Sequence, residues 1–272
     1  MTAGVKKLGA LLLCLTAFAC AQEEKVLIRS SFVELSDEEL LSDNPDRLDV
    51  YAWSLTLDYP DSISDTRGRT YPLLRDTLRR AALTSLFGRE GCDAAYAGVL
   101  PSAASERAGE DPFVTHAKRL MDKHNKTVRK SYPAARDTLR GDLRYECHYT
   151  GYIAGIRKEY VSYHIHVNEN VFGKHTRYER GLCYDLSGNR VREQELFLPG
   201  WEELLPRLLT LQFRRHFKTA GIPFREPVRP NGNFKFSPKG IVWMYDAGEI
   251  AADEYGLLRV ALPWAELAPL MK

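Results

Sequence analysis

The chain reads YECHYTGYIAG from Tyr145 to Gly155, KEYVSYHIHVNENVFG from Lys158 to Gly173, and KHTRYERGLCYD from Lys174 to Asp185. These three stretches decide the fold. All are dense in Tyr, Val, Ile and His, and glycine separates them. Tyr, Val and Ile suit the half-buried surface of a strand, and successive strands with short turns pair as neighbours. We therefore predict an antiparallel meander over residues 145–185.

Apolar residues elsewhere follow either the period of a strand or that of a helix. Strands are expected over 51–60, within 233–246 as a hairpin that turns at 237–240, and over 257–263, and helices over 72–88, 113–133, 201–217 and from 264 onward. Hairpins prevail over regular strand–helix–strand units. The sequence therefore predicts an α+β fold with antiparallel sheets, a meander and a hairpin, and helices packed on them.

The first residues have the pattern of an export signal. Lys6 and Lys7 precede an apolar run over 8–18 that is too short to span a bilayer, so residues 1–19 are interpreted as a signal peptide. Residues 17–20, AFAC, resemble a lipobox in which Cys20 would be lipidated; cleavage at an A-x-A site is the alternative. Residues 20–44 are expected to form a tether with weak local structure.

Charge and hydropathy limit the possible partners. The formal net charge is +2. Removal of the leader takes away Lys6 and Lys7 and no acidic residue, because none precedes residue 23, so the net charge falls to 0. A neutral mature chain gives no indication of a nucleic-acid partner. After Cys20 no apolar run is long enough for a membrane span, so a membrane would be met only through the lipid anchor. We expect an exported, periplasmic or outer-membrane-associated lipoprotein, with surface exposure left open.

Three cysteines remain beyond the leader: Cys92, Cys147 and Cys183. Because the number is odd, at most one intramolecular disulfide can form. Cys147 and Cys183 lie in strand-like stretches and would be the pair if a bridge forms. The alternative is that they are small buried apolar residues.

Histidines supply one candidate metal site. His164 and His166 form an H-x-H pattern, so both point to one face of a strand. With His175 from the neighbouring strand they could build a zinc site. The simpler interpretation is that they are half-exposed residues of a sheet, and on this interpretation the protein binds no metal and needs no cofactor.

Acidic residues near the end of the chain supply a second candidate. Asp246, Glu249, Asp253 and Glu254 lie close together, with Tyr245 and Tyr255 among them. Paired carboxylates can act as acid and base when they are held at a suitable separation. An acid-rich turn between strands is more often a solvated surface, and no nucleophile or phosphate-loop motif accompanies it. We therefore interpret these six residues as a contact surface and predict no catalytic residue.

The C-terminal part carries a resemblance to a known family. Its marks are Leu196-Phe197 with Gly200, Phe234 and Phe236, residues 240–245, Glu249-Ile250-Ala251, Gly256, and Leu262-Pro263-Trp264 with Leu267. This pattern resembles the extracytoplasmic C-terminal domain of unknown function of RsiV-type anti-sigma factors, which sense lysozyme, and of PdaC-type deacetylases. Residues 160–188 resemble the preceding part of that family, although only Gly173 and His175 of one family element are kept.

The resemblance implies a division into residues 45–190 and 191–272 and an exported binding module without catalytic activity. Lysozyme, another envelope protein or peptidoglycan is the implied partner. Two alternatives stay open. One is a cell-wall glycan hydrolase or deacetylase-related enzyme with a histidine-based metal site, and the other is a structural envelope component that acts as an oligomer.

Overall fold

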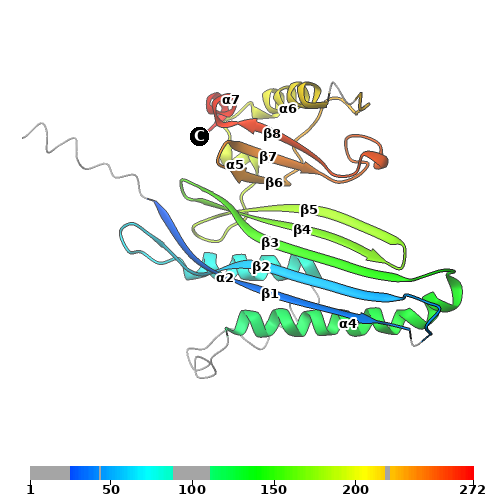
Figure 1. Cartoon of the computed structure of the whole chain (residues 1–272). Coiled ribbons are helices and arrows are strands. Elements are labelled where there is room, and N and C mark those ends of the chain that lie inside the picture. The colour runs from blue at the N-terminus through cyan, green and yellow to red at the C-terminus, as the bar shows by residue number, and fades with distance from the viewer. Residues whose placement is uncertain (1–24, 43, 88–110, 218–220) are drawn as a thin grey trace, which may run out of the picture.

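The protein has two antiparallel-rich sheets that pack against each other (Figure 1). The computed structural model describes residues 25–42, 44–87, 111–217 and 221–272. A five-stranded sheet has the order β1-β2-β3-β4-β5, and a three-stranded sheet has the order β6-β7-β8. Helices cover the outer face of each sheet, which confirms the α+β class predicted from the sequence.

The five-stranded sheet contains the predicted meander. Its strands are β1 (Val26–Leu40), β2 (Val50–Asp65), β3 (Arg144–Arg157), β4 (Tyr160–Val171) and β5 (Lys174–Asp185). β3, β4 and β5 pair antiparallel through the short turns after Arg157 and Val171. The bounds of β5 are those that the composition of the stretch predicts, because turn residues end the strand pattern on both sides.

One pairing in this sheet is parallel, which the sequence analysis did not predict. β2 runs parallel to β3, in register from Val50 with Arg144 to Leu57 with Gly151. The connection between them contains α2 (Pro72–Phe87) and α4 (Pro112–Thr138). Parallel neighbours need such a crossover, because the chain must return to the same end of the sheet before it pairs again.

α2 and α4 lie on one face of this sheet and build the first core with it (Figure 1). β2 sends alternate residues into this core, among them Tyr51, Leu55 and Leu57, all fully buried. α2 contributes Leu74 and Leu78 at helical spacing. The period-two pattern of the strand and the helical stripe therefore meet at one apolar interface, as each pattern predicts.

Residues 26–40 differ from the sequence prediction of a tether over 20–44. They form β1, which pairs antiparallel with β2 along its whole length. Val33 is buried and Ile28 and Leu35 are half-buried against the first core. The stretch is rich in Ser, Asp and Glu, so its local pattern is weak; the partner strand β2 and the apolar residues toward the core stabilise it.

The three-stranded sheet and its helices form a second core. The elements are α5 (Glu193–Leu196), α6 (Trp201–Phe217), β6 (Phe234–Ser237), β7 (Gly240–Tyr245), the 3-10 helix η1 (Asp253–Tyr255), β8 (Leu258–Pro263), α7 (Trp264–Leu267) and the 3-10 helix η2 (Ala268–Leu270). Trp243 of β7 is fully buried here, and its indole nitrogen donates to the carboxylate of Glu193. The hairpin predicted to turn at 237–240 is confirmed.

The two sheets meet where β6 crosses β4 and β5. The backbone amide of Phe236 donates to the hydroxyl of Ser162 at 3.1 Å. Asn233 bridges the sheets with its amide group: its oxygen accepts from the backbone amide of Gly181 at 2.7 Å, and its nitrogen donates to the carbonyl of Glu179 at 2.9 Å. The three-stranded sheet therefore covers part of the face that α2 and α4 leave open.

No helix of the described residues is both long and apolar enough to cross a membrane.

A candidate binding pocket at one end of the five-stranded sheet

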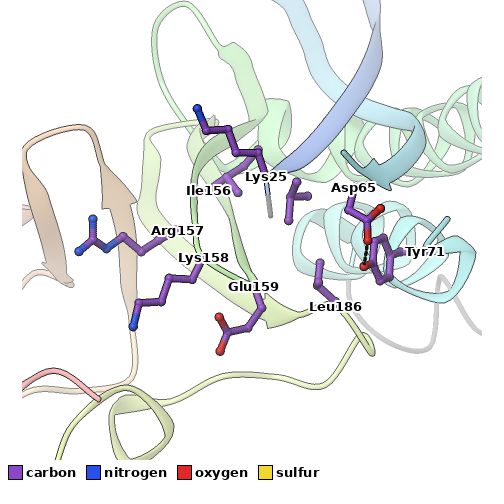
Figure 2. A pocket seen from close by; sticks show the side chains of 9 residues that line it. Lys25, Asp65, Tyr71, Ile156, Arg157, Lys158, Glu159 and Leu186 are labelled. Atoms are coloured by element: carbon purple, nitrogen blue, oxygen red, sulfur yellow. Dashed lines mark hydrogen bonds between the residues drawn. The ribbon is translucent and has the colours of Figure 1, made fainter. Parts of the chain in front are cut away.

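A pocket of about 620 Å³ opens at the end of the five-stranded sheet where β1 begins and β2 ends (Figure 2). Segments distant in the sequence line it: Lys25, Val26, Asp65, Tyr71, Ile156, Arg157, Lys158, Glu159 and Leu186. Val26, Ile156 and Leu186 are apolar, and Lys25, Arg157 and Lys158 are exposed cations. The volume lies in the range of small-molecule sites.

The turn between β3 and β4 forms one side of this pocket. Lys158 occupies it with a φ of 48°, in the left-handed region that residues other than glycine rarely adopt. Its ammonium donates to the main-chain oxygen of the C-terminal Lys272 at 3.0 Å. The guanidinium of Arg157 lies over the ring of Trp264, 4.3 Å from its centroid. The C-terminal part of the chain thus holds both cations of the turn in place.

Asp65 and Tyr71 form the opposite side, where Figure 2 shows the tyrosine hydroxyl directed at the carboxylate. The carboxylate of Asp65 is buried and accepts from the hydroxyl of Tyr71 at 2.8 Å and from Nε of Arg69 at 2.7 Å. The backbone amides of Arg67 and Arg69 also donate to it. Burial alone would raise the pKa of Asp65, but these hydrogen bonds hold it well below its usual range. Asp65 therefore fixes the turn after β2.

The predicted acidic surface lies elsewhere, on the loop between β7 and β8. Asp246 accepts from Nη1 of Arg180 at 2.9 Å. Glu249 closes the turn: one carboxylate oxygen accepts from the backbone amide of Asp246 at 2.9 Å and the other from the side-chain nitrogen of Asn231 at 2.8 Å. A second cavity, of about 410 Å³, lies beside Asp246 and Glu249. Both carboxylates are thus engaged in hydrogen bonds, Asp246 with β5 and Glu249 with its own turn and Asn231.

The other four residues of that prediction divide by burial. Tyr245 is buried, and its hydroxyl donates to the carbonyl of Arg229 at 3.0 Å. Asp253 and Glu254 are exposed in η1, and Tyr255 is half-buried beside them. A ligand at this loop would therefore contact Asp253, Glu254 and Tyr255, while Tyr245 packs beneath the turn, because its position in β7 points toward the second core.

The structure does not bring the three predicted metal-binding histidines together. His164 and His166 share the face that the three-stranded sheet partly covers, and His166 pairs with Glu179 across β4 and β5. His175 precedes Glu179 by four residues in β5, which places it about 13 Å away at the rise of a strand. The third group near the two histidines is instead the carboxylate of Glu179, which lies 3.0 Å from Nδ1 of His166 and 3.7 Å from Nε2 of His164.

Glu179 is a buried carboxylate at the junction of the two sheets. Its side chain is 1% exposed and receives the guanidinium of Arg259 from β8 through Nε at 2.8 Å and through Nη2. Burial would raise the pKa of Glu179, but the neighbouring His164 imidazole and the bonds from the Arg259 guanidinium lower it strongly. His164 is buried as well, and burial lowers its pKa. This cluster links the sheets by charge and hydrogen bonding.

Cysteine pairing is resolved for the described residues. Cys147 and Cys183 are both buried and unpaired thiols, so the alternative of a bridge between them is wrong. Cys147 belongs to the first core and Cys183 to the second, on opposite faces of the five-stranded sheet. Cys20 and Cys92 lie outside the described residues.

Neither the pocket residues nor Glu179 follows from a pattern in the sequence. Lys158 begins the second strand-like stretch in the sequence, and the pocket also needs the start of β1 and the loop after β5, which lie far from it in the chain. Glu179 could have been found by aligning the H-x-H of β4 with β5 across the turn at Phe172-Gly173, because antiparallel pairing then places it opposite His166.

Comparisons with known proteins identify similar chains without an assigned activity. The profile of a family described as a protein of unknown function, DUF3298, matches residues 194–265. A member of this family from Bacteroides fragilis has a similar structure, with a TM-score of 0.67 and 17% identity over 92% of this chain and 95% of that one. A DUF3298 family protein from Pseudomonas aeruginosa gives a TM-score of 0.51 and 13% identity over 90% and 95% of the two chains. These likenesses show the fold, and no curated protein matches the chain.

Proposed function

We propose that this protein is an exported, lipid-anchored binding module of the cell envelope that binds an acidic cell-wall fragment in the pocket beside the β3–β4 turn. The single observation that carries this proposal is the lining of the pocket. Three cations, Lys25, Arg157 and Lys158, line it together with the apolar residues Val26, Ile156 and Leu186, and they outnumber its two acids, Asp65 and Glu159. A ligand with carboxylates and short apolar groups, such as the peptide-bearing fragments of peptidoglycan, matches both features.

The cations of the turn are held in position before any ligand arrives. Lys158 is fixed by its bond to Lys272, and Arg157 by its stacking on Trp264. Groups that are already ordered lose less conformational entropy on binding. Lys158 also keeps a left-handed backbone that costs about 1–2 kcal/mol in a residue other than glycine. Such a strained residue at the edge of a pocket supports a role in binding.

The position of the pocket supports the same proposal. Lys25 lines it, and this residue follows Cys20, the proposed site of lipidation, after a short segment. An anchored chain would therefore hold the pocket close to the membrane, inside the cell envelope. The resemblance of the C-terminal part to RsiV-type sensors and PdaC-type deacetylases supports a place at the cell envelope, whereas the DUF3298 profile that matches residues 194–265 carries no function of its own.

The lining of the pocket also supports binding over chemistry. Asp65 is its buried acid, and four hydrogen bonds hold that carboxylate in the turn. A general base needs access to the proton that it removes. In this proposal Asp65 and Tyr71 therefore stabilise the turn after β2 and take no part in a reaction.

Calorimetric titration of the purified protein with muropeptides from digested peptidoglycan tests the proposal. We expect saturable binding that the Lys158→Gly variant weakens about fivefold, the equivalent of about 1 kcal/mol for one charged contact. Glycine accepts the left-handed backbone, so the variant should fold at least as well as the parent chain. Lys239→Gln, a cation in the β6–β7 turn away from the pocket, should bind like the parent chain.

Hen lysozyme serves as the second titrant. Binding of muropeptides that is equal in the Lys158→Gly variant and the parent chain would remove the pocket from the proposal. Binding of lysozyme without binding of muropeptides would replace the ligand by a protein partner. Binding of neither would overturn the proposed function.

A further inference from the structure

A second cluster of chemically active side chains lies between α4 and the five-stranded sheet. Cys147 of β3 and Glu169 of β4 are partners in the strand register, so their side chains emerge together on the face that the helices cover. His124 of α4 approaches them from the helix side. Tyr145 and Tyr149 flank Cys147 on the same face of β3, two residues away in each direction. The proposed binding pocket uses none of these residues.

The nitrogen and oxygen donor atoms of this cluster have the spacing of a metal site, and the sulfur of Cys147 lies beside them. Nε2 of His124 lies 3.5 Å from Oε1 of Glu169, and the hydroxyl of Tyr149 lies 3.2 Å from the former and 3.4 Å from the latter. The ligand atoms of His124, Cys147 and Glu169 all lie within 4.8 Å of one another. In a tetrahedral site with bonds of about 2.0–2.3 Å, two donors are separated by about 3.3–3.7 Å.

We propose that His124, Cys147 and Glu169 bind one zinc ion, with the hydroxyl of Tyr149 at the fourth position. Imidazole nitrogen, thiolate sulfur and carboxylate oxygen are all ligands of zinc, and this mixture in tetrahedral order suits it better than magnesium or calcium. A thiolate and a carboxylate neutralise the two charges of the ion. The site joins α4 to β3 and β4, so the metal fastens the helix to the sheet.

The side chains of the cluster differ in exposure, and the exposed ones leave a path by which a metal ion could enter. Cys147 is fully buried, whereas the side chains of His124 and Glu169 are 29% and 20% exposed, which leaves a path for the ion. Burial raises the pKa of Cys147 to about 12, so the metal-free thiol keeps its proton at neutral pH. Zinc would displace this proton when it binds, as it does at other cysteine ligands.

A hydrogen-bonded network without metal is the competing explanation of the same geometry. The hydroxyl of Tyr145 lies 2.5 Å from Nε2 of His124, so this bond would be exchanged for the bond to the ion. The two explanations differ in the expected effect of replacing the sulfur of Cys147. Only a metal site predicts a spectroscopic signal that depends on Cys147 and a change in thermal stability that depends on the ion.

Metal analysis and cobalt substitution of the purified protein test this inference. We expect one zinc ion per chain by mass spectrometry and a melting temperature that falls when a chelator removes it. Replacement by Co²⁺ should give the absorption of a tetrahedral ion with a thiolate-to-metal charge-transfer band. Cys147→Ser should abolish that band, and His124→Asn should lower the affinity for zinc at least tenfold.

Cys183→Ser is the matched control, because Cys183 is an equally buried thiol in the other core. It should keep both the zinc and the charge-transfer band. Circular dichroism of each variant separates loss of metal from loss of fold. Wild-type protein that takes up no stoichiometric zinc, or a charge-transfer band that persists in Cys147→Ser, would overturn the site.

Discussion

Arg259 of β8 donates to the buried carboxylate of Glu179 in β5, and this ion pair joins the three-stranded sheet to the five-stranded one. Its two partners differ in exposure. The side chain of Glu179 is 1% exposed and that of Arg259 is 53% exposed. The acid is thus the buried partner, while the base reaches it from a surface that water can enter.

Glu179→Gln should lower the free energy of unfolding by about 2–3 kcal/mol. Breaking a buried pair costs about 3–5 kcal/mol, and the exposure of Arg259 reduces that cost because the guanidinium can turn to water. Urea unfolding followed by fluorescence measures the change. Glu226→Gln removes an exposed pair with Arg214 and should cost about 0.5 kcal/mol or less. Equal losses in the two variants would show that the junction does not depend on Glu179.

His164 should make the protein less stable as the pH falls below about 6.5, the usual pKa of histidine. Burial and the charges of Lys235 and Arg259 lower the pKa of His164, and Glu179 opposes them. The unfolded chain therefore takes up a proton that the native chain does not, and stability declines as pH falls through that range. Urea midpoints between pH 7.5 and 5 should show a smaller slope in His164→Gln than in the parent chain.

His175→Gln provides the comparison for that slope, since His175 is exposed at the far end of the β4–β5 hairpin. It should leave the dependence on pH unchanged. Glu179 does not interfere in this window, because a carboxylate with a lowered pKa loses its contribution only below the unfolded value of about 4.3. Identical slopes in His164→Gln and the parent chain would contradict the prediction.

Gly181→Ala should weaken the packing of the two sheets. A Cβ at this position would overlap the backbone carbonyl of Phe234, which cannot move aside as a side chain can. Overpacking of this kind costs about 1–3 kcal/mol or more. Gly155→Ala is the graded comparison, because its Cβ would stand 3.2 Å from Phe236 and needs only a small shift. Calorimetric melting temperatures should fall further for Gly181→Ala, and the reverse order would refute the contact.

Asn233→Ala should destabilise the junction by about 2–3 kcal/mol. The change leaves the backbone amide of Gly181 and the carbonyl of Glu179 without the side chain that now bonds them. Buried polar groups without a partner cost about 1–3 kcal/mol each. Hydrogen exchange should report faster exchange at Gly181 in the variant. Asn189→Ala, which removes an exposed bond to Asp185, should change stability little.

Local patterns predicted much of the fold. The composition of residues 145–185 yields β3, β4 and β5, and the apolar stripe from Leu74 to Leu86 yields α2. These elements follow from residue type and period, which act between near neighbours. β1 was not predicted, because its apolar residues are few and its stability depends on pairing with β2, which follows it in the chain.

The residues of the candidate sites were harder to predict from the sequence than the strands and helices. The acids at 246–254 were chosen because they are close in the chain, yet Asp246 pairs with Arg180 of β5 and Glu249 bonds to the backbone of its own turn. The pocket combines residues from 25 to 186, and the zinc cluster combines His124, Cys147 and Glu169. None of these groups has a spacing that marks it in the sequence, because three separate elements bring the residues together.

The sequence by itself determined the strands of the meander and the helical stripes, since each depends on a pattern within one short segment. Only the tertiary structure decided that β2 lies parallel to β3, that Cys147 and Cys183 face opposite cores, and that Lys158 is held at a pocket by Lys272. These relationships depend on which faces pack together. That choice rests on the burial of apolar surface over the whole chain, which no single segment encodes.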